Sequence, residues 1–163
     1  MSLHTLKRVQ TLPVTIQAAW DFFSSPLNLS VITPPEMKFR VLSKFKPGDK
    51  IFKNMLIDYR VNPLFGIPML WQTKITEVDA PYFFVDEQLK GPYAYWHHEH
   101  RFREVSGGTE MTDLVQWRVP FGWAGDVVNE LVVRKRVEAI FNFREKKLNQ
   151  LYAEPQFASS NHR

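Results

Sequence analysis

The sequence contains no cysteine, which excludes disulfide bonds, thiolate metal sites and a cysteine nucleophile. It has no apolar run long enough to cross a membrane, and no hydrophobic leader opens it. Internal repeats, linkers and low-complexity segments are absent too, so one domain is expected. We therefore expect a cytoplasmic protein without an integral membrane segment. Whether it makes transient contact with a membrane surface stays open.

Charge of either sign is modest and is spread along the chain. The formal net charge is +4 and no basic run occurs, so we do not expect a nucleic-acid partner. Aromatic residues, in contrast, are plentiful, with 13 Phe and 5 Trp among 163 residues. They suit either a large core or an apolar cavity lined by flat rings. We expect a single domain over residues 1–152 and a loose tail over 153–163.

The most informative stretch runs from Gly91 to Gly122 and predicts one long β-hairpin. Its turn is Ser106-Gly107-Gly108-Thr109, because a Gly-Gly pair provides two residues with positive φ for a type I′ loop. Counting outward from this two-residue loop places His100 opposite Val115 and leaves Asp113 diagonal to His100.

Alternation along the two strands separates a solvent face from a core face. The solvent face is nearly all polar. The core face is mostly apolar, yet it also carries His98, His100 and Asp113, which we therefore expect to point inward. The complete core face consists of Trp96, His98, His100, Phe102, Met111, Asp113, Val115, Trp117 and Val119.

Strand and helix signals precede this hairpin. Thr15 suits the N-cap of a short helix, and Ser25-Pro26 begins a second helix that Thr33-Pro34-Pro35 ends. Whether Asp86 or Glu87 faces inward stays open, because both faces of their strand contain a carboxylate. The expected strands cover residues 3–11, 38–43, 51–61, 67–78 and 82–89.

A long amphipathic helix is expected over residues 126–152, after the last strand. Arg144 falls within its apolar stripe. This side chain either faces a cavity as a cation for a ligand carboxylate or phosphate, or it extends its charged end to solvent or pairs with an internal acid such as Asp113, and the second interpretation is favoured. The rest of the stripe consists of Val133, Val137, Ile140, Phe141, Leu148, Leu151 and Tyr152.

Short motifs along these elements are Thr33-Pro34-Pro35, Gly91-Pro92 followed by Trp96, His98, His100 and Phe102, Met111-Thr112-Asp113, Pro120-Phe121-Gly122, and Phe141 with Arg144. With these motifs, nearly the whole chain resembles the START/Bet v 1-like superfamily, also called SRPBCC or polyketide cyclase-like, and within it a bacterial ligand-binding branch. The resemblance implies an α+β helix-grip fold, in which a curved antiparallel seven-stranded sheet wraps around a long C-terminal helix, with two short helices after the first strand. It also implies a cavity between sheet and helix that holds an apolar small molecule.

Three roles stay open for His98, His100 and Asp113: polar anchors for a ligand, an acid–base group, or an internally satisfied network. A metal site is not predicted, because neighbouring residues of a strand point to opposite faces and only His98 and His100 share one. Asp113 as a third ligand is the sole route to such a site that the sequence offers. No cofactor is expected.

The function expected from the sequence is a carrier or sensor of a lipid, isoprenoid or polyketide-like molecule. A cyclase/dehydratase-type enzyme is the first alternative, with His98 or His100 moving a proton and Asp113 orienting the ring. An interaction module with a filled core is the second, and no partner protein is indicated. The expected ligand-binding residues are Tyr59, Trp71, Trp96, His98, His100, Asp113, Trp117, Phe141 and Arg144.

Overall fold

The computed structural model describes residues 1–153, so all but the first residue of the expected tail lies outside the described residues. Seven strands form one sheet in the order β1-β7-β6-β5-β4-β3-β2, and every neighbouring pair is antiparallel. This confirms the expected seven-stranded sheet. The strands are β1 (His4–Leu12), β2 (Arg40–Val41), β3 (Leu56–Val61), β4 (Met69–Asp79), β5 (Phe83–Lys90), β6 (Tyr95–Val105) and β7 (Gly108–Arg118).

Two of the strands are shorter than expected. The strand expected over 38–43 is reduced to Arg40–Val41, and the strand expected over 51–61 begins only at Leu56. A turn precedes Leu56 where the longer strand was expected. In this turn Asn54 has a φ of 71°, and the Met55 amide donates to the Phe52 carbonyl. A residue with positive φ cannot continue a strand, and this one delays its start.

The helical brace after β1 is only partly α-helical. Helix α1 (Ile16–Phe23) begins as expected at Thr15, whose Oγ1 accepts a hydrogen bond from the Ala18 amide at 3.2 Å. The second expected helix is a 3₁₀ helix, η1 (Pro26–Ile32), and it is followed by a further 3₁₀ turn, η2 (Pro35–Met37). Short segments bounded by proline favour such tight turns over α-helix.

The C-terminal helix is continuous from Gly122 to Leu151 and contains one π-helical segment. It consists of α2 (Gly122–Val128), the π-helix η3 (Asn129–Val133) and α3 (Arg134–Leu151). It therefore begins four residues before Asp126, the expected start. Asp126 instead accepts hydrogen bonds from the amide and hydroxyl of Ser2. One residue of the expected apolar stripe, Leu151, is exposed.

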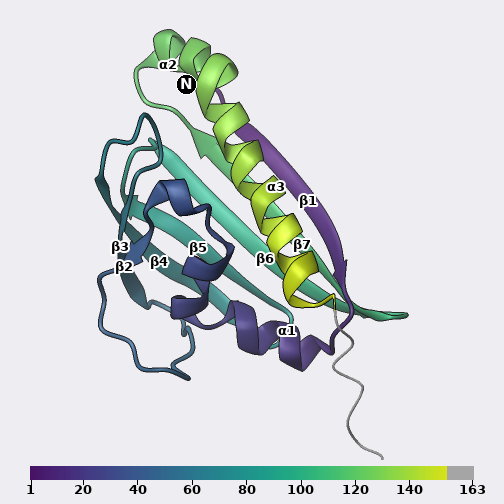
Figure 1. The fold of residues 1–163 in the computed structure, drawn as a ribbon. Coiled ribbons are helices and arrows are strands. Elements are labelled where there is room, and N and C mark those ends of the chain that lie inside the picture. Colours follow the sequence, from purple (N-terminus) through teal and green to yellow (C-terminus); the bar gives the residue numbers. More distant parts are fainter. Residues whose placement is uncertain (154–163) are drawn as a thin grey trace, which may run out of the picture.

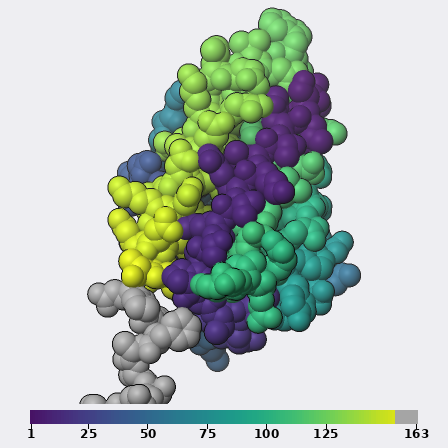
Figure 2. Space-filling view, turned by 90° about the vertical axis from the view of Figure 1, so that its right-hand side faces the viewer, coloured from purple at the N-terminus to yellow at the C-terminus, as the bar shows by residue number. Residues whose placement is uncertain are grey.

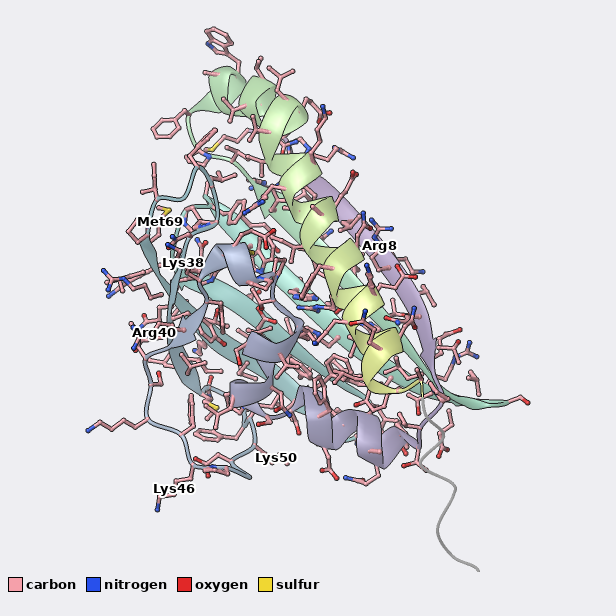
Figure 3. All side chains as sticks on the ribbon, in the orientation of Figure 1. Arg8, Lys38, Arg40, Lys46, Lys50 and Met69 are labelled. Carbon is pink, nitrogen blue, oxygen red and sulfur yellow. The ribbon has the colours of Figure 1, made fainter. Side chains whose placement is uncertain are left out.

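The helix lies across the concave side of the sheet, with α1 near its C-terminal end and α2 at the other end (Figure 1). Figure 2 shows β1 lying beside the helix, although the two are far apart in the sequence. Arg8 of β1, labelled in Figure 3, donates to Asn142 at 2.9 Å. Gln10 of the same strand donates to Asn149 at 2.8 Å. These contacts fix the helix along one edge of the sheet.

The hairpin register differs from the expected one by two residues. The loop consists of Ser106 and Gly107, and Val105 faces Gly108 across it. Of the two loop residues only Gly107 has a positive φ, of 87°. Gly108 begins β7 instead, where an added Cβ would lie 2.0 Å from the carbonyl oxygen of Leu12. A shift of two residues leaves each side chain on its face, so the expected core face is retained.

The interior consists of two apolar clusters separated by a polar layer. One cluster lies under α1 and contains Met111, Phe102 and Leu148. The other lies under η3 and contains Val115. Between the two clusters, β6 contributes two histidines, β7 an aspartate, and α3 Arg144. On β6, β7 and α3 alike, polar residues interrupt the apolar pattern at the same level of the interior. These polar groups therefore lie together.

Candidate functional site

The polar layer contains four buried ionisable side chains. The exposed fraction is 4% for His98, 5% for His100 and Asp113, and 6% for Arg144. The two histidines lie two residues apart on β6 and so share one face of the sheet. Asp113 lies directly opposite His100 in the ladder rather than diagonal to it. Arg144 reaches the same point from the helix above.

Asp113 is the centre of this layer. Its Oδ1 accepts a hydrogen bond from His98 Nε2 at 2.8 Å and one from Arg144 Nη1 at 3.2 Å. The Nδ1 atom of His100 lies 3.1 Å from the same oxygen. One carboxylate oxygen thus meets three nitrogen-bearing groups, which lowers the cost of burying its charge.

A second carboxylate, Asp86 of β5, completes the group. Its Oδ2 lies 2.8 Å from His100 Nε2 and 3.7 Å from His98 Nδ1. The pairing of β5 with β6 places Asp86 opposite His98, and this settles which carboxylate of the strand faces inward. Glu87 points the other way and lies 2.8 Å from His97 Nδ1. The sequence offered no signal for this choice, because both faces of the strand carried an acid.

The two histidines differ in their pKa values. Burial, followed by repulsion from His100, lowers the pKa of His98 to about 4. Burial also opposes charge on His100, but the neighbouring carboxylates of Asp113 and Asp86 outweigh this effect and raise its pKa. Burial has the opposite effect on carboxyl groups, and by itself it would raise the pKa of Asp113 and Asp86. Their cationic partners hold the pKa of Asp113 well below its usual value and lower that of Asp86.

These directions favour ionised carboxylates on Asp86 and Asp113 beside the Arg144 guanidinium, with a proton held more readily by His100 than by His98. A neutral His98 donates through Nε2 to Asp113. Its Nδ1 makes no hydrogen bond to any residue in the described range 1–153 and is then a free base.

Aromatic rings hold the two imidazoles in place. The ring of Phe84 stacks on His100 with centroids 4.1 Å apart, and the His98 and His100 rings are 3.7 Å apart. Phe141 meets His98 edge to face, and the Arg144 guanidinium lies 4.7 Å above the Phe141 ring. This packing restricts the rotamers of the polar groups.

A cavity of about 160 Å³ opens next to this cluster, between the sheet, the helix and the α1–η1 segment. Most of its wall is apolar, and Asp86, His98, His100 and Arg144 supply charged or ionisable groups. Arg144 therefore both pairs with an internal acid and faces the cavity. Of the nine residues expected to bind a ligand, those in the wall are Tyr59, Trp71, Trp96, His98, His100, Phe141 and Arg144.

Two of the expected ligand-binding residues lie behind the wall of this cavity. Asp113 is not part of the wall, although its hydrogen-bond partner His98 is. Trp117 is completely buried, and its Nε1 donates to Asn129 Oδ1 at 2.7 Å. Its place beyond Val115 puts it in the cluster under η3. Alternation predicts the face of a residue but not its distance from a cavity.

Several wall residues were not anticipated. Phe39 and Tyr93 come from loops, where no periodicity marks an inward side chain. Asp86 and Phe84 come from the strand whose faces the sequence did not separate. Ile140 belonged to the expected apolar stripe of the helix but was not assigned to a cavity.

Asp86, His98 and His100 also bring possible metal-ligating atoms together. One such atom from each lies within 4.8 Å of the other two. This corrects the interpretation that Asp113 offered the sole route to a third ligand, because the register of β5 against β6 supplies Asp86 instead.

Within residues 1–153, no helix combines the length and the apolar character needed to span a bilayer. No protein-family model matches the sequence, and no curated protein sequence matches it either. Solved structures, however, share its fold over almost their whole length.

Protein CV1439 from Chromobacterium violaceum has a TM-score of 0.69 at 12% identity, with 92% of this chain and 97% of that chain covered. Protein Ms6760 from Mycobacterium smegmatis has a TM-score of 0.62 at 18% identity, with 93% and 98% covered. Ara h 8.0201 has a TM-score of 0.57 at 15% identity, with 91% and 99% covered. The fold is therefore the helix-grip fold of Bet v 1-like proteins.

Proposed function

We propose that the protein binds an apolar or aromatic small molecule, such as a lipid, isoprenoid or polyketide-like compound, as a carrier or sensor. The observation that carries this proposal is the cavity, in which an apolar wall meets a few convergent polar groups. The fold supports it, because Bet v 1-like proteins commonly bind hydrophobic ligands. A cavity of this kind also speaks against an interaction module with a filled core.

The size and wall of the cavity indicate what fits. Its volume of about 160 Å³ is close to the roughly 150 Å³ of an apolar cavity that accepts benzene. Burial of about 100 Å² of apolar ligand surface contributes about 2.5 kcal/mol. The aromatic pair Trp71 and Trp96, with centroids 5.3 Å apart and rings nearly perpendicular, offers both a face and an edge to a flat ligand.

The polar groups set the orientation of the ligand. Asp86 accepts hydrogen bonds, and a neutral His98 accepts through Nδ1, so a ligand hydroxyl finds acceptors there. Arg144 belongs to the wall of the cavity, and its guanidinium is a suitable donor for an oxygen of the ligand. The ligand is therefore expected to bind with a hydroxyl, carbonyl or carboxylate directed toward α3.

Native mass spectrometry of the purified protein, followed by solvent extraction, tests the proposal directly. We expect a copurified molecule, or saturable binding of the fluorescent probe 8-anilinonaphthalene-1-sulfonate after extraction. Ile140→Trp, which fills the cavity from the helix side, should abolish both signals. Val127→Trp on the exposed side of α2 is the matched control and should change neither. Probe binding that persists unchanged in Ile140→Trp would contradict the proposal.

An enzyme of the cyclase/dehydratase type is a second candidate, and one observation favours it. His98 is oriented by Asp113 through Nε2, while its Nδ1 faces Asp86 at 3.7 Å without hydrogen-bonding to it. A carboxylate that orients an imidazole whose other nitrogen is free is the arrangement of a general base. Arg144 would then stabilise a developing enolate.

The two candidates differ in what happens to the copurified molecule. If the protein is an enzyme, fresh protein converts that molecule or its precursor, and His98→Ala and His100→Ala abolish the conversion while binding persists. Binding and conversion that fall equally in both variants would count against catalysis. A carrier returns the molecule unchanged.

Transient membrane contact is supported by exposed apolar residues at one end of the sheet. Strands β3 and β7 end on the same side because the strands between them alternate in direction. Phe65 follows β3, and Phe121 and Trp123 follow β7, with exposed fractions of 77%, 83% and 81%. The double variant Phe121→Ala with Trp123→Ala should reduce cosedimentation with phosphatidylglycerol vesicles, and Phe52→Ala, at the opposite end, should not.

A further inference from the structure

The side chains of Asp86, His98 and His100 converge on one point at the edge of the cavity. Asp86 Oδ2 lies 2.8 Å from His100 Nε2 and 3.7 Å from His98 Nδ1. One possible donor atom of each residue lies within 4.8 Å of the others. A tetrahedral ion with bonds of about 2.1 Å holds its donor atoms about 3.4 Å apart. To hold an ion, the Asp86–His100 pair must separate by about half an ångström, whereas Asp86 and His98 already lie close to that spacing.

The backbone fixes this convergence. His98 and His100 are two residues apart on β6, so they share a face, and Asp86 lies opposite His98 on β5. All three belong to neighbouring strands of a sheet rather than to loops. Sites on strands hold their ligand atoms more precisely than sites on loops do.

Asp113 and Arg144 form a second layer around the same point. The remaining nitrogen of each imidazole lies near Asp113: His98 Nε2 hydrogen-bonds Asp113 Oδ1 at 2.8 Å, and His100 Nδ1 lies 3.1 Å from the same oxygen without a hydrogen bond. Arg144 Nη1 holds that oxygen at 3.2 Å. Metal-ligating histidines almost always donate their other N–H to such a carboxylate, which fixes the tautomer and raises the basicity of the ligand atom.

We propose that Asp86, His98 and His100 form a binding site for one divalent transition-metal ion of the zinc class. Two imidazoles and one carboxylate are a known ligand set for zinc and for iron(II), and they leave coordination positions open. Here those positions face the cavity, since all three side chains belong to its wall. The site stands on this geometry alone and does not depend on the apolar ligand proposed above.

The charges around the site indicate what the ion's open position takes. With a divalent ion bound and both imidazoles neutral, the charges of the ion, Arg144, Asp86 and Asp113 leave one positive charge uncompensated. An anionic oxygen, such as hydroxide, a carboxylate or an enolate, removes it. Among apolar molecules, a bound ion would therefore select those that carry an acidic oxygen.

A third histidine, His97, provides an internal control. It lies next to His98 but points to the opposite face, where Glu87 and Glu99 approach its two nitrogens at 2.8 and 3.3 Å. Because these carboxylates lie at opposite nitrogens of one ring, they cannot chelate a single ion together with it. A surface contribution to metal binding is thus separable from the inner site by one substitution.

The test is zinc binding by the chelator-stripped protein, measured by competition with a zinc indicator and by elemental analysis after gel filtration. The wild type should retain one equivalent. Asp86→Asn and His98→Asn should abolish retention, and Asp113→Asn should weaken binding about 10- to 100-fold, as expected when a carboxylate behind a ligand is lost. His97→Asn should bind as the wild type does.

X-ray absorption at the zinc edge of the wild type keeps the proposal testable if a variant fails to fold. Two imidazole ligands support it, and one or none overturns it. Absence of retained zinc in the wild type also overturns it, as does retention that persists in Asp86→Asn and His98→Asn or is lost in His97→Asn. None of these outcomes bears on binding of 8-anilinonaphthalene-1-sulfonate, so this proposal and the proposed function fail separately.

Discussion

Arg144 of helix α3 and Asp113 of strand β7 form a buried ion pair, with 3.2 Å between Nη1 and Oδ1. The pair connects the long helix to the middle of the sheet and lies between the two apolar clusters of the interior. Neither charge reaches bulk water, so each is stabilised by the other, and Asp113 is stabilised also by the imidazoles of β6.

Arg144→Met should therefore lower the free energy of unfolding by about 3–5 kcal/mol, because it leaves Asp113 buried without its cationic partner. Equilibrium unfolding in urea measures the change. Arg134→Met is the control on the same helix, since Arg134 lies 3.6 Å from the exposed Glu130. That surface pair should contribute less than about 1 kcal/mol. Equal losses of unfolding free energy in the two variants would show that the buried pair contributes no more to stability than the surface pair.

Asn129→Ala should lower the free energy of unfolding by about 1–3 kcal/mol, because two buried groups lose their partner. Asn129 accepts from Trp117 Nε1 at 2.7 Å and donates to His4 Nδ1 at 3.1 Å. Urea unfolding again gives the value. Asn142→Ala removes an exposed bond to Arg8 and should change stability by less than about 0.5 kcal/mol. If Asn129→Ala leaves the free energy of unfolding unchanged, water has replaced the lost amide as the partner of these groups.

Gly125→Ala should destabilise the protein, although alanine is the better helix former by about 1 kcal/mol. A Cβ at Gly125 would lie 1.9 Å from the Pro120 carbonyl oxygen, so the first turn of α2 must move away from the end of β7. Overpacking of this kind costs about 1–3 kcal/mol. Thermal unfolding followed by circular dichroism provides the measurement, and a raised melting temperature would refute the expected close approach.

The free energy of unfolding should fall as the pH rises above 10. Burial raises the pKa of Tyr93, and burial with the nearby charges of Asp86 and Asp58 raises that of Tyr59. In the unfolded chain both phenols lose their protons near the ordinary pKa of 10, so the stability they contribute is complete below pH 10 and is lost above it.

Ultraviolet titration of the tyrosinates isolates this effect. While the protein stays folded, Tyr59→Phe and Tyr93→Phe should leave the absorbance step between pH 10 and about 11.5 unchanged, because neither phenol contributes to it. A smaller step in Tyr59→Phe or Tyr93→Phe would show that the ring reaches solvent.

The sequence by itself determined the sheet, the long helix and the side of the sheet on which each hairpin residue lies. Alternation with a period of two places His98, His100 and Asp113 inside for any pairing shifted by an even number of residues, because a shift of two residues moves no side chain to the other face. Helical spacing likewise placed Arg144 on the buried stripe. These signals are local and need no knowledge of neighbouring strands.

Only the tertiary structure decided which of these groups meet and which reach the cavity. The period of two determines the faces, but it does not distinguish His100 opposite Val115 from His100 opposite Asp113. The position of the two-residue loop at Gly107 sets the second pairing. Asp86 entered the cluster through the pairing of β5 with β6, which depends on loops and side-chain packing rather than on its own segment. Distances across a sheet and between a sheet and a helix are set by the packing of the whole chain, so the residues that can hold a ligand emerged only when the chain was folded.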